Sequence, residues 1–318
     1  MKVSFVSSLL ALPLLAAAAP KPEAAELSSR DVTVTQQELN GFMYMRQLAS
    51  AAYCNSKDSL VGQKVTCSNN ACPDIGAANV VNFAHLESNH LTDTPHDGAN
   101  STDIGIKADG AVFIDHTRGG IVMSFMGSKS WQSFMTDLDF TGSDSSEICS
   151  GCTVHYGIKL TYDIIEGALI NALNSARAQW PSYQVVATGH SIGAGVATVA
   201  AARLRNRLNV DIQLYTFGSP RVGNDAFATF VTNQNRGRNY RITHYDDVVA
   251  ALPPSWAGFA HVSPEYWLRR KDASDFNYPL SEVVVCEGIN PKGCRNSMGT
   301  TLSGKAHGEY FGAISACY

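Results

Sequence analysis

Charged residues are scarce in this sequence, and no run of like charges is long. Lysine, arginine, aspartate and glutamate together make up 16% of the 318 residues, whereas hydrophobic residues make up 45%. A chain with this composition is able to bury a sizeable core and is not disordered throughout. The formal net charge is -4, and the short arginine cluster at 236–241 is typical of a solvated loop. We therefore expect no nucleic-acid partner, because such a partner requires a basic face.

Long hydrophobic runs are missing beyond the N-terminus. No other stretch approaches the roughly 20 apolar residues that span a bilayer. Residues 1–19 carry Lys2, then an apolar run, then small residues at 16–19. This pattern is typical of a secretory signal peptide. Residues 20–30 are expected to be either a propeptide removed near Arg30 or a flexible tail, and residues 31–318 a single domain. We expect the mature protein to be an extracellular monomer.

Two features are typical of a secreted chain, a glycosylation sequon and an even number of cysteines. The sequon begins at Asn100 and reads Asn-Ser-Thr. Eight cysteines favour a full set of disulfides, although spacing alone leaves their connectivity open. Three close pairs stand out and leave two cysteines to join the ends of the domain: Cys67 with Cys72, Cys149 with Cys152, Cys286 with Cys294, and then Cys54 with Cys317. The spacing at 149–152 also fits a redox motif, but a structural bridge is favoured outside the cell, and no ligand pattern predicts a zinc or other metal site.

Expected strands and long helices alternate along the chain. A Thr-Gln-Gln-Glu capping box at 35–38 predicts a helix that ends at about residue 53. The apolar patterns further predict strands at 111–115, 121–125, 183–188, 211–217, 239–245 and 281–286, and helices at 158–178 and 192–206. This alternation predicts an α/β fold with a mainly parallel central sheet flanked by helices.

Residues 189–193 read Gly-His-Ser-Ile-Gly and match the G-x-S-x-G motif. The motif alone is weak, but here an apolar strand is expected before it and a helix after it. That setting places Ser191 on a strained turn with its Oγ exposed above the sheet. A Cβ at Gly189 or Gly193 is expected to clash with the neighbouring helix or strand. Ser191 is therefore the candidate nucleophile.

A serine hydroxyl needs a histidine base and an acid that orients the base. In this type of fold the acid follows the serine, and the histidine follows the acid. Asp246 and Asp247 come directly after an expected strand, and the pattern does not separate them. His244 precedes both and is excluded. Chain order favours His307, which lies beyond the last expected strand, over His261, which lies before it.

Two backbone N–H groups are expected to bind the oxyanion. One belongs to Ile192, the residue after the nucleophile. The other is expected on the loop after the strand at 121–125, where Gly127 permits a sharp turn and Ser128 is placed to donate.

Residues 130–138 follow this loop and carry one apolar helical face. Its members are Trp131, Phe134, Met135 and Leu138. Such a stripe usually faces a core. Its position beside the oxyanion loop favours instead a lid that covers the site in water and turns its apolar face to lipid.

Taken together, these features resemble the filamentous-fungal class 3 lipases, the family of the Thermomyces and Rhizomucor enzymes. The similarity extends from about Val34 to Cys317. Besides the serine motif at 188–193, it rests on Ala-Ala-Tyr-Cys at 51–54, the cysteines at 67 and 72, Ser-Phe-Met-Gly-Ser at 124–128, Ile-Cys-Ser-Gly-Cys at 148–152, Ser-Pro-Arg-Val-Gly-Asn at 219–224, Tyr-Arg-Ile-Thr-His at 240–244, Ser-Pro-Glu-Tyr-Trp at 263–267 and Ala-His at 306–307.

The resemblance implies an α/β-hydrolase fold and matches Asp247, rather than Asp246, to the family's acid. It matches His307 to the family's histidine and places His261 outside the triad. It also implies the oxyanion donors Ser128 and Ile192, a lid at about 130–138, and disulfides that join Cys54 to Cys317, Cys67 to Cys72 and Cys149 to Cys152, with Cys286–Cys294 as a pair that some members have.

The sequence departs from the family pattern near the lid and the acyl groove. Met126 replaces an arginine, and Ile158 and Tyr162 replace two aromatic residues. After the acid, Val-Ala-Ala-Leu at 249–252 replaces the family's Val-Pro-basic-Leu, so this loop lacks the constraint of a proline. These changes concern substrate preference and remove no triad member.

The function expected from these features is ester hydrolysis without cofactor or metal. Acylglycerol at an oil–water interface is the expected substrate, with transient contact to lipid. Hydrolysis of soluble esters, as in a feruloyl esterase, is the alternative within the enzyme class, and an apolar lid favours the lipase. A catalytically inactive homologue that binds lipid or a surface is a third interpretation. It predicts a broken triad or oxyanion hole, whereas every such position is filled here.

Overall fold

The computed structural model describes residues 34–87, 109–128 and 140–317. Several expectations concern residues outside these ranges and are not addressed by it: the signal peptide at 1–19, the segment at 20–30, the sequon at Asn100, and the apolar face of Trp131, Phe134, Met135 and Leu138. Within the described ranges, no helix has the length and apolar character to cross a membrane.

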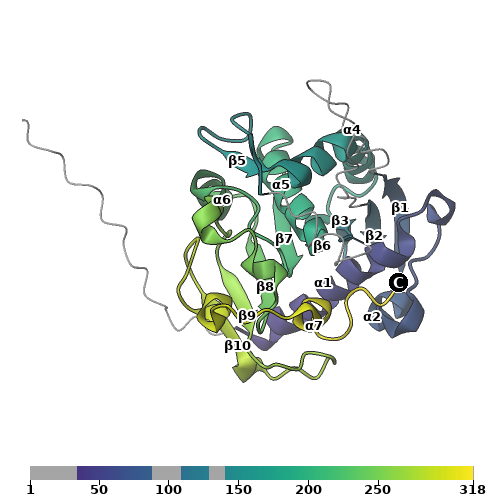
Figure 1. Ribbon diagram of the computed structural model, residues 1–318. Coiled ribbons are helices and arrows are strands. Elements are labelled where there is room, and N and C mark those ends of the chain that lie inside the picture. The colour runs from purple at the N-terminus through teal and green to yellow at the C-terminus, as the bar shows by residue number, and fades with distance from the viewer. Residues whose placement is uncertain (1–33, 88–108, 129–139, 318) are drawn as a thin grey trace, which may run out of the picture.

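Eight strands form the central sheet (Figure 1). In their order across the sheet they are β1 (Val80–Leu86), β2 (Gly110–Asp115), β3 (Gly120–Phe125), β6 (Gln184–His190), β7 (Ile212–Phe217), β8 (Asn239–His244), β9 (Glu265–Leu268) and β10 (Val283–Cys286). The pairs from β3 to β9 are parallel, whereas β1–β2, β2–β3 and β9–β10 are antiparallel. The expected mainly parallel sheet is therefore confirmed. A separate hairpin pairs β4 (Gly142–Asp144) with β5 (Thr153–His155).

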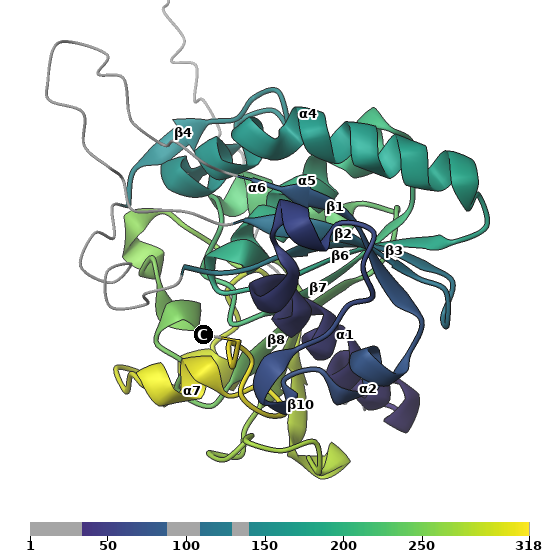
Figure 2. The same ribbon diagram turned by 90° about the vertical axis from the view of Figure 1, so that its right-hand side faces the viewer.

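Helices cover both faces of this sheet. Figure 2 shows α4 (Tyr156–Gln179) and α5 (Ile192–Arg207) above the sheet and α1 (Gln36–Asn55) below it. The helix α6 (Asp225–Asn233) packs on the α5 side, and the short helices are α2 (Pro73–Ala77) and α7 (Gly304–Gly308). One apolar core lies between the sheet and α4, α5 and α6, and two clusters fill the α1 side. Because α5 is enclosed by the sheet and α4, its small residues are buried around nearly its whole circumference.

The first helix begins as its sequence predicts. The backbone N–H of Glu38 donates to Thr35 Oγ1 at 3.2 Å, and the N–H of Thr35 donates to Glu38 Oε2 at 2.9 Å. This reciprocal pair is a capping box, which satisfies N–H groups that have no acceptor within the helix. The helix therefore starts at Gln36 and runs to Asn55, close to the expected end.

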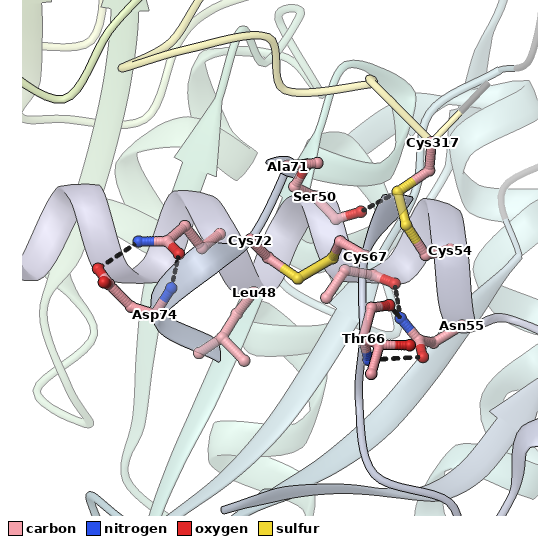
Figure 3. The surroundings of a disulfide bond; sticks show 12 residues. Leu48, Ser50, Cys54, Asn55, Thr66, Cys67, Ala71, Cys72, Asp74 and Cys317 are labelled. Carbon is pink, nitrogen blue, oxygen red and sulfur yellow. Dashed lines mark hydrogen bonds between the residues drawn. A yellow bond between two sulfur atoms is a disulfide. The ribbon is translucent and has the colours of Figure 1, made fainter. Parts of the chain in front are cut away.

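Four disulfides link the described chain, and they are the expected pairs: Cys54–Cys317, Cys67–Cys72, Cys149–Cys152 and Cys286–Cys294. Figure 3 shows the Cys54–Cys317 bridge between the last turn of α1 and the C-terminal segment, with the Cys67–Cys72 bridge beside it. Asn55 Nδ2, next to the first bridge, donates to the carbonyl of Thr66 at 2.9 Å. The long-range bridge therefore fixes the end of α1 to the segment that follows α7.

Most expected elements are present, with small shifts at their ends. The expected helix at 158–178 is α4, which begins two residues earlier, and the expected strand at 183–188 continues as β6 to His190. The strands β1 and β9 and the helix α6 were not expected as elements. In β1 the alternation of apolar residues is broken by a bulge between Asn82 and Ala84, and β9 is only four residues long.

Candidate active site

Ser191 occupies a sharp turn between β6 and α5. Its φ of 60° and ψ of -132° lie in a region that non-glycine residues rarely adopt. The turn is held by a hydrogen bond from the Ser191 N–H to the carbonyl of Phe217 on β7, at 3.0 Å. A Cβ on Gly193 would lie 2.3 Å from the carbonyl oxygen of Phe125, and one on Gly189 would lie 2.4 Å from that of Gly193. A side chain at either position would therefore clash with the neighbouring backbone, as expected.

Asp247 and His307 meet beside this turn as a buried pair. His307 Nδ1 lies 3.0 Å from both carboxylate oxygens of Asp247, and both side chains are almost fully buried. Asp247 comes from the loop after β8, and His307 from α7. Asp246, which the sequence pattern did not separate from Asp247, is only partly buried, and among the described residues its carboxylate forms no hydrogen bond to His307. The geometry therefore selects Asp247.

The carboxylate of Asp247 accepts further hydrogen bonds that keep it ionised. Tyr310 Oη donates to Oδ2, and the N–H of Val249 donates to Oδ1 at 2.8 Å. Burial by itself raises the pKa of Asp247, but the charge of His307 and these hydrogen bonds outweigh it and hold the pKa below its ordinary value. The same burial and the adjacent carboxylate raise the pKa of Tyr310, so its hydroxyl stays protonated and donates.

The second nitrogen of the His307 imidazole is not bound by Asp247. His307 Nε2 is buried and has no hydrogen-bond partner among the described residues, and within them Ser191 Oγ makes no hydrogen bond to it. The hydrogen bond between nucleophile and base often tightens only when substrate binds. The Nε2 atom is thus the unused acceptor that a general base requires.

His190, the residue before the candidate nucleophile, contacts His307 directly and the loop after β3 through Tyr53. Its ring stacks on that of His307, with centroids 4.5 Å apart, and its Nε2 donates to the His307 carbonyl at 2.9 Å. Its Nδ1 accepts from Tyr53 Oη at 2.7 Å. Burial, together with the charge of His307, lowers the pKa of His190 from 6.5 to about 3. The ring is therefore neutral at ordinary pH, with Nε2 as the donor.

The loop after β3 passes directly over the nucleophile. The N–H of Gly127 donates to Tyr53 Oη at 2.8 Å. A Cβ on Gly127 would lie 2.6 Å from Ser191 Cβ. Gly127 does not have a positive φ, so here glycine is required because the loop approaches Ser191 so closely. Next to it, Ser128 Oγ is buried and has no hydrogen-bond partner among the residues that the structure describes.

The second expected oxyanion donor lies at the start of α5. Ile192 is the first residue of this helix, and the first N–H groups of a helix have no acceptor within it. Ser128, next to Gly127, and Ile192, next to Ser191, thus remain the two candidate donors, on two different elements.

Buried side chains hold the backbone of the acid loop, residues 246–253. Arg295 donates from Nε to the carbonyl of Asp247 at 3.0 Å. Arg221 Nη1 donates to the carbonyls of Ala251 and Pro253 at 2.6 and 2.8 Å. His261, matched above to a position outside the triad, lies 2.8 Å through Nε2 from the carbonyl of Ala250. These contacts supply the constraint that this loop lacks without a proline at 250.

Four of these residues were not singled out by the sequence. Their roles depend on neighbours that are distant in the chain, and nothing in the local sequence pattern distinguishes them: Tyr310, Tyr53, His190 and Arg295. The tyrosine at 53 and the histidine at 190 lie within segments that carry the family resemblance, which was the available signal for them.

Comparison with known proteins places this site in a family. The model of the class 3 lipases matches residues 122–256, and that of the lipase 3 N-terminal region matches residues 8–80. A secreted mono- and diacylglycerol lipase 1 from Fusarium solani is 38% identical over 98% of this chain and 89% of its own length. A secreted mono- and diacylglycerol lipase A from Penicillium cyclopium is 35% identical, over 91% of this chain and 87% of its own.

Solved structures agree with the sequence relatives. The structure of a mono- and diacylglycerol lipase from Aspergillus oryzae has a TM-score of 0.78 and 32% identity, and the match covers 90% of this chain and all of that one. The similarity in sequence and in fold thus extends over nearly the whole chain, and the related enzymes are named as secreted proteins, in agreement with the leader expected at 1–19. The chain therefore belongs to the class 3 lipase family and is a secreted carboxylic ester hydrolase with an α/β-hydrolase fold.

Proposed function

We propose that this lipase hydrolyses acylglycerols at an oil–water interface, with Ser191 as nucleophile, His307 as general base and Asp247 as the acid that orients the base. The observation that carries the proposal is the buried Asp247–His307 pair next to the strained turn of Ser191. An ionised carboxylate at Nδ1 holds the imidazole in the tautomer whose Nε2 is free to accept a proton.

The reaction follows from this arrangement in two halves. His307 Nε2 takes the proton of Ser191 Oγ as the oxygen attacks the ester carbonyl carbon. The tetrahedral intermediate collapses, the bond to the alcohol oxygen breaks, and the alcohol leaves with the proton from His307. Water then repeats the sequence on the acyl-enzyme, releasing the fatty acid and restoring Ser191.

The negative charge of each tetrahedral intermediate is assigned to Ser128 and Ile192. Ile192 directly follows Ser191 at the start of α5, and Ser128 directly follows Gly127, which closely approaches Ser191. Fixed donors are effective here because they need no reorganisation when the charge develops. The Oγ of Ser128, which makes no hydrogen bond within ranges 34–87, 109–128 and 140–317, is proposed as a further donor.

The substrate class follows from the family and its relatives. The relatives from Fusarium, Penicillium and Aspergillus are named for mono- and diacylglycerols, so partial glycerides are the first substrates to test. The segment 130–138 is proposed to act as the lid, with Trp131, Phe134, Met135 and Leu138 turned to lipid when it opens.

The experiment is a rate measurement on a short-chain acylglycerol taken through its solubility limit, with Ser191→Ala alongside. We expect the rate to rise sharply once an emulsion forms, and the variant to lose at least about 10⁴-fold in kcat. Saturation below the limit, without a rise, would assign the protein to soluble-ester hydrolysis. Retention of activity by the variant would exclude Ser191 as the nucleophile.

A further inference from the structure

Large apolar side chains are exposed at four positions of the described chain, and two of these positions adjoin the active site. The exposed fractions are 83% for Trp256, 55% for Leu302, 41% for Val61 and 40% for Ile164. Trp256 lies on the segment that follows the acid loop, and Leu302 on the segment that leads into α7 and His307. Trp256 and Leu302, the two most exposed of these four residues, are therefore the two that lie beside the catalytic loops.

Trp256 lies on a segment that hydrogen bonds hold at both ends. It lies in the 3-10 turn Ser255–Ala257 directly after Pro254. On one side, Arg221 binds the carbonyl of Pro253 at 2.8 Å, and on the other the N–H of Ala260 donates to the carbonyl of Gly223 at 2.8 Å. The indole therefore projects into solvent from a segment whose two ends are fixed to the body of the protein.

Leu302 lies on a segment that is hydrogen-bonded to the start of the acid loop. The N–H of Ser303 donates to the carbonyl of Asp246 at 3.0 Å, and residues 247 and 303 form an isolated parallel bridge. In Figure 2 the pale-green segment after β8 lies directly above α7 at the same edge of the molecule. The segments that carry Trp256 and Leu302 are therefore both joined to the acid loop, next to the catalytic pair.

The two segments that carry Trp256 and Leu302 contain no ionic side chains. Residues 248–263 and 296–304 contain no aspartate, glutamate, lysine or arginine. Lys305 is exposed but pairs with Glu309 at 3.5 Å, and Arg221 and Arg295 are buried with their donors on backbone carbonyls. An anionic membrane or an acidic macromolecule would call for a basic patch, whereas an uncharged lipid surface matches this composition.

We propose that Trp256 and Leu302 form a fixed contact surface that seats the active site on an uncharged acylglycerol–water interface. Indole rings favour such a boundary because one edge is apolar and the N–H remains hydrated. The surface is distinct from the segment 130–138, since it belongs to the loops that carry Asp247 and His307. The inference rests on the proposed function, because it assumes that the substrate is presented as an interface.

Binding is tested without turnover, by flotation of the Ser191→Ala protein with dioleoylglycerol droplets. Adding Trp256→Ala is expected to weaken partition about tenfold, since that corresponds to losing the burial of part of one aromatic ring. Trp256→Ala with Leu302→Ala is expected to weaken it further, and Trp256→Phe to retain most of it. Ile164→Ala is the matched control, because Ile164 is an exposed apolar residue on α4, and it should leave partition unchanged.

Two companion measurements complete the test. In the active protein, hydrolysis of dissolved p-nitrophenyl acetate should stay within about twofold for Trp256→Ala, because the surface acts only at an interface. Undiminished droplet partition of the double variant overturns the inference, as does an equal loss on the dissolved ester or stronger binding to phosphatidylserine vesicles than to dioleoylglycerol. Absence of ester hydrolysis by the unmodified protein would instead contradict the proposed function, and droplet partition is read independently of it.

Discussion

Arg295 Nε donates to the backbone carbonyl of Asp247, so a buried guanidinium holds the proposed acid by its main chain. The same group donates through Nη2 to the carbonyl of Thr301 at 2.9 Å and through Nη1 to that of Gly299 at 3.3 Å. It thereby ties the acid loop to the segment that leads into His307. Arg295 directly follows Cys294. The disulfide from Cys294 to Cys286 fixes the backbone next to Arg295 to the end of β10.

Replacing Arg295 with Met should therefore affect both stability and catalysis. The carbonyls that lose their donor stay buried, and the free energy of unfolding should fall by about 3 kcal/mol. A shift of the Asp247 loop should lower kcat about 10- to 100-fold, with KM nearly unchanged because no substrate contact is removed. The measurements are thermal unfolding and steady-state kinetics on a dissolved ester.

Two variants control for this change. Arg269→Met removes an exposed ion pair with Glu282 and should alter stability by less than about 1 kcal/mol. Arg295→Lys keeps the charge with fewer donors and should fall between the unmodified protein and the Met variant. A folded Met variant with full kcat would contradict the positioning role.

Tyr310→Phe should make stability less dependent on acid pH. The pKa of Asp247 lies below its ordinary value of 3.8, so its ionised form stabilises the folded chain above that value. This stabilisation disappears as the pH falls through the folded pKa. Without the Tyr310 hydroxyl the pKa of Asp247 rises, and the variant should lose about 1–3 kcal/mol at pH 7 but less near pH 3.

Urea unfolding at several pH values measures this difference. Tyr278→Phe is the matched control, because Tyr278 Oη bonds to the backbone N–H of Arg270 and the carbonyl of Glu282 rather than to a carboxylate. Its loss should be the same at both pH values. A Tyr310→Phe loss that is equally independent of pH would mean that the hydroxyl does not stabilise the charge of Asp247.

His190 should dominate the acid sensitivity of the fold at milder pH. Its pKa is about 3 when folded and 6.5 ordinarily, with burial as the main cause. The unfolded chain therefore binds the extra proton first, and stability falls as the pH drops from about 6.5 towards 3, by up to about 1.4 kcal/mol per pH unit. His190→Gln, which does not titrate, should be less stable at pH 7 yet show a flatter profile across this window. An unchanged slope would exclude His190 as the titrating group.

Gly127→Ala should damage catalysis through shape alone. The added Cβ meets Ser191 Cβ at 2.6 Å and Tyr53 Oη at 2.7 Å, so the loop must move away from the nucleophile. We expect kcat to fall by about 10²-fold, as for loss of an oxyanion donor. Gly41→Ala in α1 meets nothing within 4 Å and should instead stabilise the fold by about 0.5–1 kcal/mol, with full activity. Equal kcat for both variants would contradict the assigned loop position.

The sequence was most informative where chemistry and local structure coincide. The serine motif between a strand and a helix locates Ser191, and chain order leads from it to His307. Asp246 and Asp247 were separable only by family resemblance, because adjacent residues on one loop share the same pattern and differ in burial alone. The contacts of Tyr310 and Arg295 with Asp247 join residues 63 and 48 positions apart and leave no periodic signal. The edge strand β1 escaped prediction because a bulge interrupts its alternation, and the interior strand β9 escaped it because it is only four residues long.

The central claim, that Ser191 is the nucleophile activated by His307, is tested most directly by covalent trapping. The purified protein would be treated with a p-nitrophenyl alkylphosphonate, and the modified peptide identified by mass spectrometry. We predict a single adduct on Ser191, with labelling slowed by at least about 10³-fold in His307→Ala and in Asp247→Asn, but not in Asp246→Asn. An adduct on another residue, or labelling of Ser191 at an undiminished rate without His307, would contradict the account.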